Sequence, residues 1–307
     1  MNKKMWKQKN EKSLITLFNK GLWDKEISIK MWKTEDMIRN KLKRLWLFRA
    51  EVITKPKILL FDIETAPMVV YSWWLFDQDI GINQIKKDWF MLSWSAKWLG
   101  DDKVIAGTVS PQESQNQDDK RITKLLWDLV SEADILVAHN GDRFDIRKMN
   151  TRFLKYGLWQ PNRYQSIDTL KIARKNFSVS SNKLDYLCTF LWVPGKISTW
   201  WFELWEKCIR WDKKSLKLME DYCKNDVKIL EDVYLKLRPY NGGTVNIGMY
   251  LEDWKQHCSR CGSTKLKWGW VCVSWMSRYR TAKCECGAVV RDNKSLTNKD
   301  KRKLLTK

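Results

Sequence analysis

The chain has 307 residues, 44% of them apolar, so it can bury one large core with small appendages and is too apolar for general disorder. No apolar run is long enough for a membrane span, and because the first ten residues carry four lysines and no apolar stretch, we expect no secretory signal. Eight cysteines without such a signal favour reduced thiols or a metal site over disulfides, so we expect a cytoplasmic protein with no membrane partner.

The net charge of +21 is concentrated at the two ends of the chain. Residues 1–55 carry 15 basic and 6 acidic side chains, and residues 241–307 carry 14 and 5. The segment 56–240 is nearly neutral, with 28 basic and 25 acidic side chains. Concentrated positive charge attracts polyanions, so both ends are predicted to bind nucleic acid. The alternative is a solvated surface that serves only solubility.

Residues 1–50 are predicted to form a small helical module with helices over 13–18, 25–31 and 35–47. Asp24 and Thr34 are the expected N-caps of the second and third helices. The third helix has a basic surface that is predicted to contact nucleic acid, made of Arg39, Lys41, Lys43 and Arg44. This layout resembles the helix-turn-helix modules of bacterial and phage DNA-binding proteins. A helical hairpin packed on the main domain is the alternative.

Residues 56–240 are predicted to form an α/β domain. The expected strands lie at 57–64, 89–100, 103–109 and 134–138, and the expected helices at 121–132, 144–156 and 214–237. Short connections favour an antiparallel meander for the first three strands, and the later alternation of helices and strands adds parallel pairing. The predicted fold class is therefore a mixed sheet flanked by helices. The polar segment 111–120 is expected to be a surface loop.

Three segments of this domain place acidic side chains beside apolar elements. Asp62 and Glu64 end the first strand, and their i, i+2 spacing puts both on one face. Asp145 opens a helix that follows an apolar strand. Tyr222 and Asp226 are four residues apart on the last helix and share a face. Each segment alone has a structural alternative, namely a surface carboxylate pair, a carboxylate at a helix N-terminus and a packed tyrosine.

In this order, the segments FDIET, NGDRFDIRK and EDYCKNDV resemble the three motifs of the DEDD superfamily of 3′–5′ exonucleases. The resemblance covers about residues 57–238, and the tyrosine of the third motif is typical of the tyrosine subgroup. The surrounding sequence is similar to the exonuclease domains of family B polymerases and their phage relatives. The resemblance implies an RNase H-like fold and a phosphodiester hydrolase with Tyr222 as a catalytic residue. Its implied metal ligands are Asp62, Glu64, Asp145 and Asp226.

Four carboxylates suit two Mg²⁺ or Mn²⁺ ions, which are hard cations that prefer oxygen ligands. Two such ions can hold the attacking and leaving oxygens of a phosphoryl displacement, so no side-chain nucleophile is needed. We expect Tyr222 to orient the attacking water. Asn140 is predicted to contact nucleic acid, whereas His139 is interpreted as structural and Asp168 as structural or peripheral.

The expected substrate is DNA, with RNA as an alternative. Two other functions stay open. One is a DNA-binding regulatory protein with a vestigial nuclease site, which the presence of all four carboxylates and the tyrosine disfavours. The other is an endonuclease on the same fold, because the metal chemistry does not set polarity. The resemblance places the activity in the bacterial cytoplasm or in a phage-infected host.

Two cysteine pairs predict a zinc ribbon over residues 246–291 with one structural Zn²⁺. The predicted ligands are Cys258, Cys261, Cys284 and Cys286. A glycine follows each pair and relieves the turn around a metal. The second pair is one residue shorter than the usual Cys-x-x-Cys, so Cys272 or His257 could replace a ligand.

The C-terminal segment also contains basic residues that could bind nucleic acid. Arg278, Arg280 and Lys283 are predicted to contact nucleic acid, and residues 292–307 are expected to be a basic disordered tail. The scattered cysteines are interpreted as packing residues; they are Cys188, Cys208 and Cys223.

Tryptophan is unusually frequent and glycine unusually rare. The chain has 20 tryptophans and 13 glycines, where an average chain of this length has about 21 glycines. Eight tryptophans stand where glycine is expected: Trp32, Trp46, Trp74, Trp192, Trp200, Trp201, Trp211 and Trp275. Others, such as Trp94, Trp98 and Trp205, fit an aromatic position. We predict UGA codons that the source reads as glycine; the alternative is a naturally tryptophan-rich protein.

Overall fold

The structure is a computed structural model that describes residues 8–20, 22, 24–45, 55–193, 201–243, 245–251 and 253–305. The chain divides into two compact units, Met1–Thr54 and Lys55–Lys307. Of the predicted N-terminal module, residues 1–7, 21, 23 and 46–50 lie outside the described residues. Among the described residues, no helix has the length and apolar character needed to cross a membrane.

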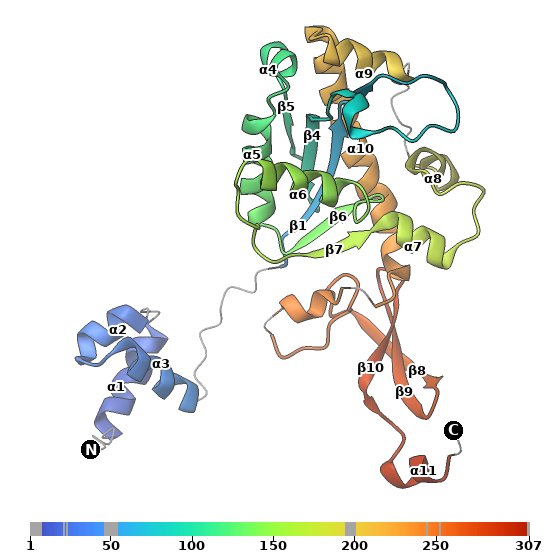
Figure 1. The fold of residues 1–307 in the computed structure, drawn as a ribbon. Helices are drawn as coiled ribbons and strands as arrows, with labels where there is room; N and C mark the ends of the chain where they lie inside the picture. The colour runs from blue at the N-terminus through green and yellow to red at the C-terminus, as the bar shows by residue number, and fades with distance from the viewer. Residues whose placement is uncertain are drawn as a thin grey trace. The chain divides into compact units, whose positions relative to one another are not determined.

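The first unit consists, in its described part, of three helices (Figure 1). They are α1 (Gln8–Asn19), α2 (Asp24–Met31) and α3 (Glu35–Arg44). Their small core is formed by Leu14, Ile27, Ile38 and Leu42, all of which are buried. The backbone N–H of Met37 donates to the hydroxyl of Thr34 at 3.3 Å, which confirms Thr34 as an N-cap.

A five-stranded sheet forms the centre of the second unit, in the order β5-β4-β1-β6-β7. The strands are β1 (Ile58–Thr65), β4 (Met91–Trp98), β5 (Val104–Thr108), β6 (Ile135–Ala138) and β7 (Gln165–Asp168). β4 pairs antiparallel with both β1 and β5, whereas β6 pairs parallel with both β1 and β7. The predicted mixed sheet is therefore confirmed, because only the strands reached through helices are parallel.

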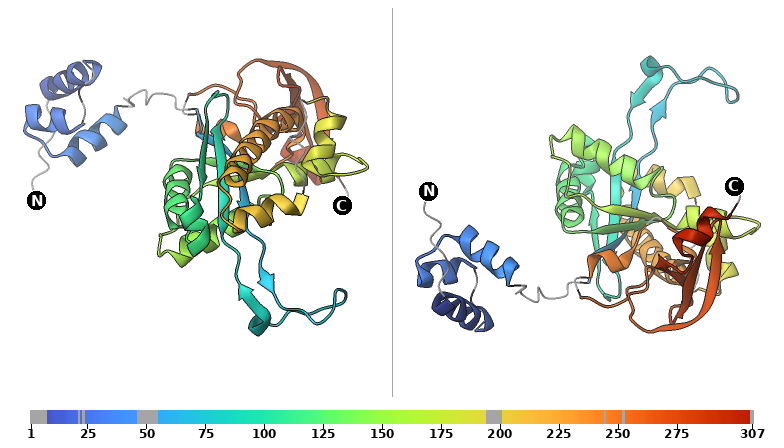
Figure 2. Two further views of the ribbon diagram at one scale, coloured as in Figure 1. Left: turned by 90° about the horizontal axis from the view of Figure 1, so that it is seen from above. Right: turned by 90° about the horizontal axis from the view of Figure 1, so that it is seen from below.

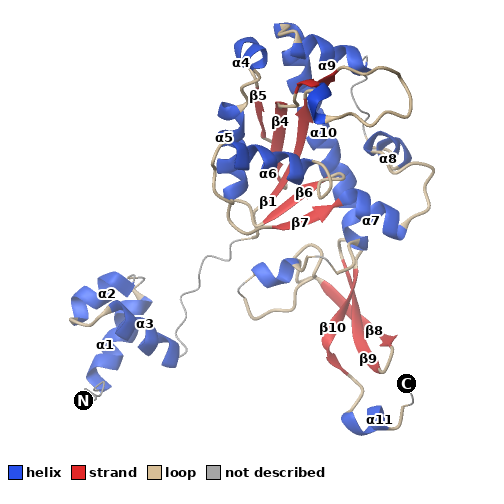
Figure 3. Cartoon of the chain, in the orientation of Figure 1, coloured by secondary structure: helices blue, strands red, loops and turns tan. Residues whose placement is uncertain are grey.

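Helices cover both faces of this sheet (Figures 2 and 3). The alternation of β1 explains this arrangement, since successive side chains point to opposite faces. Phe61 and Ile63 pack in one cluster with α5 (Lys120–Ser131) and α6 (Asp145–Lys155). Leu60 packs in the other cluster with the second half of α10 (Lys213–Leu237). Both faces of β1 are thus buried, and the strand reads as an apolar run.

The long helix α10 is tied to the sheet at β4. Ser93 and Ser95 of β4 are fully buried, and such small side chains allow a helix to approach closely. Further along β4, Lys97 forms a largely buried ion pair with Glu231 of α10. The other oxygen of Glu231 accepts the N–H of Gly100 at 2.8 Å. These contacts fix the distance and the register of α10 relative to β4 and β1.

Several shorter elements complete the second unit. The helices are α4 (Pro111–Asn116), α7 (Thr169–Asn176), α8 (Leu184–Phe190), α9 (Trp201–Ile209) and α11 (Lys299–Lys303), with 3₁₀ turns η1 (Ile82–Gln84), η2 (Arg238–Tyr240) and η3 (Ile247–Tyr250). A two-stranded hairpin of β2 (Val69–Val70) and β3 (Ile85–Lys87) lies between β1 and β4 in the sequence. A three-stranded sheet near the C-terminus contains β8 (Leu266–Ser274), β9 (Ser277–Cys284) and β10 (Val289–Ser295).

The expectation of a surface loop over 111–120 is wrong for its first half, which forms α4. The hydroxyl of Ser110 accepts the N–H of Glu113 at 3.2 Å, and the Glu113 carboxylate accepts the N–H of Ser110 at 2.7 Å. Pro111 occupies the first helical position. This reciprocal capping box stabilises a short helix even in a polar segment.

The expectation of a disordered tail over 292–307 is also wrong for the residues that the structure describes. Strand β10 continues through Ser295, and α11 begins after Asn298, whose side chain caps the helix by accepting the N–H of Lys301 at 2.8 Å. Arg302 donates to the hydroxyl of Ser277 at 2.6 Å. Pairing with β9 and this side-chain contact order the segment despite its charge.

Candidate functional site

Three carboxylates meet where β1 ends against α10. Asp62 and Glu64 project from the same face of β1, opposite Ser95 and Ser93 of β4, toward α10. Oxygen atoms of Asp62, Glu64 and Asp226 all lie within 4.8 Å of one another. Asp226 is only 4% exposed, so its charge is poorly hydrated. Such a group of like charges is costly unless a cation neutralises it, which makes this cluster a candidate site for a divalent metal.

The fourth predicted ligand, Asp145, lies beside this group and outside it. Its Oδ1 accepts the backbone N–H of Ile63 at 3.0 Å, so it contacts β1 between Asp62 and Glu64. β1 pairs with β6 only as far as Leu60, and Asp145 satisfies an N–H beyond that pairing. Burial, and next the charge of Asp62, raise the pKa of Asp145 well above its ordinary value. Without a cation, burial and the neighbouring charge therefore favour the neutral form of Asp145.

Tyr222 lies one turn before Asp226 on α10, as the sequence predicts. It is 7% exposed, and its ring meets that of Trp205 edge to face at a centroid distance of 6.0 Å. Tyr222 and Asp226 thus approach the same region from one helix, with the tyrosine held by an aromatic neighbour from α9.

Cys223 is a residue of the site that sequence reasoning missed. Its thiol donates to Asp62, with Sγ 3.5 Å from the backbone oxygen and 3.6 Å from Oδ2. Burial, followed by the charge of Asp62, raises the pKa of Cys223 well above its ordinary value, so it remains a thiol. It packs as expected, but it packs on a predicted metal ligand. Its place beside Tyr222 in the third motif was the available signal.

The polar residues after β6 have structural partners, as expected for His139 and Asp168. The ring nitrogens of His139 lie 2.9 Å from the hydroxyl of Thr169 and 2.9 Å from the backbone oxygen of Asn182. Asp168 accepts the N–H of Asn140 at 2.9 Å and caps α7. Asn140 has a positive φ of 65°, and its side chain lies in the loop that leads to Asp145.

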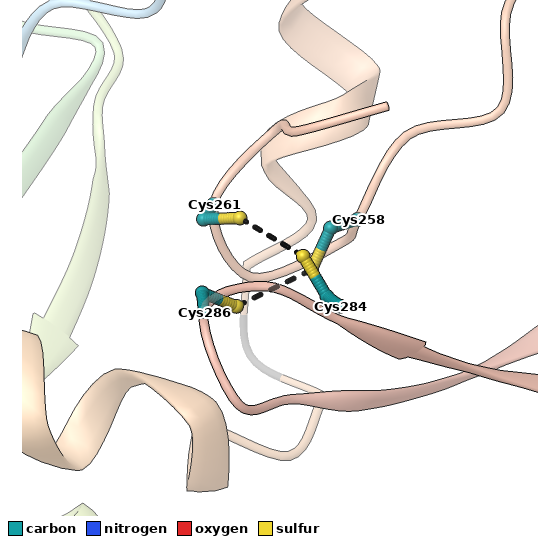
Figure 4. A group of neighbouring side chains, drawn as sticks. All are labelled: Cys258, Cys261, Cys284 and Cys286. Carbon is teal, nitrogen blue, oxygen red and sulfur yellow. Dashed lines mark hydrogen bonds between the residues drawn. The ribbon is translucent and has the colours of Figure 1, made fainter. Parts of the chain in front are cut away.

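Four cysteine sulfurs form a second cluster in the C-terminal part (Figure 4). The Sγ atoms of Cys258 and Cys286 are 3.8 Å apart, and those of Cys261 and Cys284 are 3.5 Å apart. All four lie within 4.8 Å of one another. The hydrogen bond from Cys261 lowers the pKa of Cys258 to about 5, so the cluster holds a thiolate at neutral pH. Thiolates in this arrangement are the ligands that zinc prefers.

The short second pair needs no substitute ligand. His257 bonds to the backbone oxygen of Gly262 at 2.7 Å and to the carboxylate of Asp253, and Cys272 lies on β8 outside the cluster. Gly262 and Gly287 have φ values of 78° and 88°, as expected for tight turns after each pair.

The basic residues predicted to contact nucleic acid differ in their surroundings. Arg39 on α3 lies within 4.0 Å of three carboxylates, and Lys41 pairs with Glu11 of α1, so part of the basic surface is neutralised locally. Arg44 is exposed, and the side chain of Lys43 lies outside the described residues. On β9, Arg278 and Arg280 point to one face of the sheet and Lys283 to the other, because they differ by an odd number of residues.

Parts of the chain are similar to known proteins. Residues 95–238 match the family model of the RNase_H superfamily. The sheet and its helices form an RNase H-like fold. An 80-residue segment is 39% identical to a protein described as DNA polymerase III PolC-type from Ureaplasma parvum serovar 3; this is 26% of the present chain and 6% of that polymerase.

A solved structure of the family B DNA polymerase from the archaeon Pyrobaculum calidifontis is similar with a TM-score of 0.45 and 14% sequence identity. The similarity covers 64% of the present chain and 27% of the polymerase chain. In both comparisons the chain spans less than a third of the polymerase.

The carboxylate cluster predicts stabilisation by divalent cations that increases with pH. At about 100 times the Kd, Mn²⁺ should raise the Tm by about 5–10 °C. The folded state raises the pKa of Asp145, so this residue contributes to the free energy of unfolding at low pH, where it is protonated. This contribution is lost as the pH rises through the folded-state pKa. A cation displaces this proton, so the Tm shift should increase as the pH rises through the folded-state pKa of Asp145.

Asp221 provides a matched control on the same helix, because it is half-exposed and pairs with Lys217 at 3.1 Å. The shift should vanish in Asp226→Asn and persist in Asp221→Asn, measured by differential scanning fluorimetry. Equal shifts in both variants would show that the cation binds elsewhere.

Proposed function

We propose that the protein is a metal-dependent 3′–5′ exonuclease of the tyrosine subgroup of the DEDD superfamily, with DNA as its substrate. The observation that carries this proposal is the cluster of Asp62, Glu64 and Asp226 on an RNase H-like fold, with Tyr222 one helical turn from Asp226. Asp145, held at the edge of β1, completes the set of four carboxylates.

The residues of the site fit two Mg²⁺ or Mn²⁺ ions, because they offer only hard oxygen ligands. Asp62, Glu64 and Asp226 would hold them together with Asp145, once Asp145 has lost its proton. When bound, such ions lower the pKa of a water and neutralise the charge that develops on the leaving oxygen. The protein contributes no nucleophile of its own in this scheme.

The protein side chains then have separate tasks. Tyr222 offers a hydroxyl group to orient the attacking water, and its ring position is fixed by Trp205. The Cys223 thiol donates to Asp62 and restricts the orientation of that carboxylate. Holding a ligand through a neighbouring donor preserves the geometry that the metal requires.

A nuclease assay with single substitutions tests this proposal. The substrates are 5′-labelled single-stranded and double-stranded DNA and RNA, incubated with Mg²⁺. Asp226→Ala should reduce the rate by about 1000-fold or more, because a metal ligand is lost, whereas Asp221→Ala should retain nearly the full rate. Tyr222→Phe should slow the reaction by about 10–100-fold without abolishing it.

The products distinguish the alternatives. A 3′–5′ exonuclease gives a ladder of labelled fragments that shorten from the 3′ end, and near-normal activity of Asp226→Ala would refute the metal assignment. Cleavage of a circular single strand would indicate an endonuclease. Binding without any cleavage by the unmodified protein would indicate a vestigial site.

We further propose that the four cysteines hold one structural Zn²⁺ in a ribbon over residues 246–291. Four thiolates form a closed site, so this ion supports the fold and has no position for a substrate. Residues 1–50 are proposed as a helix-turn-helix module, and residues 56–240 as the exonuclease domain. A cytoplasmic location is proposed, in bacteria or in a host infected by phage.

Metal analysis tests the ribbon. We expect about one zinc per chain, lost in the double variant Cys258→Ser/Cys284→Ser and retained in Cys272→Ser, whose thiol lies outside the cluster. Zinc retained by the double variant would refute the assignment.

A further inference from the structure

The C-terminal sheet of β8, β9 and β10 has two chemically different faces. The register pairs Trp268 with Ala282 and Trp270 with Thr281, and a bulge between the two tryptophans places them on opposite faces. The inner face packs in the core of the cysteine cluster, with Leu266, Trp268, Ala282, Cys284 and Val290. The opposite side, here called the outer face, carries Lys267, Trp270, Cys272, Tyr279, Thr281, Lys283, Val289 and Arg291.

Two aromatic rings on the outer face each lie beneath a cation. Nζ of Lys283 is 4.7 Å from the ring centroid of Trp270, and Cζ of Arg291 is 4.3 Å from that of Tyr279. Trp270 is 47% exposed although it sits in the middle of a strand. Solvent-accessible aromatic rings next to cations are the combination that binds single-stranded nucleic acid, through base stacking and phosphate contacts.

The charge of the outer face is positive and is not neutralised locally. Among the described residues, Lys267, Lys283 and Arg291 form no salt bridge, and the outer-face positions of the three strands contain no carboxylate. On the inner face, by contrast, Arg280 lies 3.5 Å from the carboxylate of Asp292. Three cations of the outer face are therefore free to contact phosphates, whereas on the inner face Arg280 is paired and Arg278 forms no salt bridge with any described residue.

We propose that the outer face binds a single strand of the substrate, with unpaired bases stacked on Trp270 and Tyr279. A base can displace the flexible side chain of Lys283 from the indole, and the ammonium group then meets a phosphate of the same strand. This inference rests on the proposed nuclease function for its substrate class. Of the three residues of this sheet that the sequence predicts to contact nucleic acid, only Lys283 lies on the proposed binding face. Arg278 and Arg280 lie on the inner face.

Binding measurements in a cleavage-deficient background test this inference separately from catalysis. Fluorescence anisotropy of a labelled dT oligomer is measured with the full chain carrying Asp62→Ala, with its zinc retained. Trp270→Ala should weaken binding by about tenfold, and Tyr279→Ala by a similar factor. Lys283→Ala and Arg291→Ala should each reduce the slope of log K against log salt by about one.

Arg278→Ala and Arg280→Ala are the matched controls, because they remove the same charge from the same strand on the other face. They should change affinity by less than about twofold, and a matching duplex should bind the unmodified protein more weakly than the single strand. Equal losses on both faces, or equal affinity for the duplex, would overturn the proposal. A protein that binds as described but never cleaves would refute the proposed function alone.

A second inference comes from the backbone of four tryptophans. Trp32, Trp192, Trp211 and Trp275 have φ values of 50°, 56°, 67° and 45°. Positive φ is uncommon outside glycine, and for a bulky residue it is an outlier. All four belong to the eight positions where glycine is expected from the sequence. The ten described tryptophans outside that set, including the buried Trp94, have no positive φ.

Three of the four end helices in the same motif. The backbone N–H of Trp192 donates to the carbonyl oxygen of Thr189 at 3.3 Å, and the N–H of Val193 donates to the carbonyl oxygen of Cys188 at 2.9 Å. Trp32 and Trp211 show the same pair of bonds, at 3.4 and 3.1 Å and at 3.0 and 3.1 Å. This is the Schellman arrangement, in which the left-handed residue is usually glycine.

The chain contains glycine in the identical geometry elsewhere. Gly157 has φ of 65°, and the bonds from Gly157 to Leu154 and from Leu158 to Phe153 are 3.1 and 2.9 Å long. Trp275 is the first of two residues in the turn between β8 and β9, and it alone of the two has positive φ. That is the glycine position of a type II′ hairpin turn.

We infer that the natural protein has glycine at 32, 192, 211 and 275, encoded by UGA. The indoles contribute little packing at these sites, since Trp32, Trp192 and Trp275 are 94%, 93% and 83% exposed. Of the other predicted positions, Trp74 and Trp201 have no positive φ, and Trp46 and Trp200 lie outside the described residues. The structure therefore supports half of the predicted set.

The gene and the source protein test this inference directly. Codons 32, 192, 211 and 275 should be UGA and codon 94 UGG, and peptides from the natural source should have glycine masses at these four positions. UGG at any of the four, or a tryptophan mass there, would refute the assignment for that position.

Stability measurements test its physical basis. Trp192→Gly and Trp211→Gly should each have a Tm about 2–4 °C above the matching alanine variants, because alanine retains the strained Cβ. At the control position Trp159, which is exposed without positive φ, glycine should be no more stable than alanine. Glycine variants no more stable than alanine variants at 192 and 211 would remove the structural argument.

Discussion

The close approach of α10 to β1 and β4 is the constraint on which the candidate site depends. Asp62 and Glu64 come from a strand, and Asp226 comes from a helix and lies 162 residues or more further along the chain, yet their oxygens lie within 4.8 Å of one another. Two buried serines on β4 allow the helix to come close, and the ion pair of Lys97 with Glu231 sets its register. Packing elsewhere thus holds the three carboxylates close together in spite of their mutual repulsion, which a bound cation would reduce.

The edge of β1 fixes the position of Asp145 whether its carboxyl group is protonated or charged. β6 stops pairing with β1 after Leu60, and the carboxylate of Asp145 accepts the N–H of Ile63 instead. This bond holds Asp145 next to the cluster while burial favours its neutral form. A cation that binds nearby reverses that preference, because it supplies the charge that burial removes. The placement of Asp145 therefore does not require a cation, although a bound cation would favour its charged form.

The sequence predicts the site well where periodicity decides the geometry. The i, i+2 spacing of Asp62 and Glu64 and the i, i+4 spacing of Tyr222 and Asp226 follow from strand and helix repeats alone. The sequence does not reveal that Cys223 bonds to Asp62, because that contact requires the packing of α10 on β1. Polar composition wrongly predicts a loop for residues 111–116, where a capping box stabilises a helix. The faces of the ribbon depend on one bulge, which no spacing rule locates.

Position 211 links the strained tryptophans to the site. It is the left-handed residue that ends α9, and the next residue, Asp212, caps α10 by accepting the N–H of Ser215 at 2.7 Å. The path of the chain through this single residue therefore decides where α10 begins, and with it the position of Asp226 relative to β1. A residue without a Cβ adopts this conformation at no steric cost, whereas an indole adopts it only because the packing of both helices enforces it. Glycine at 211 thus relieves strain at the junction that positions Asp226, a proposed metal ligand.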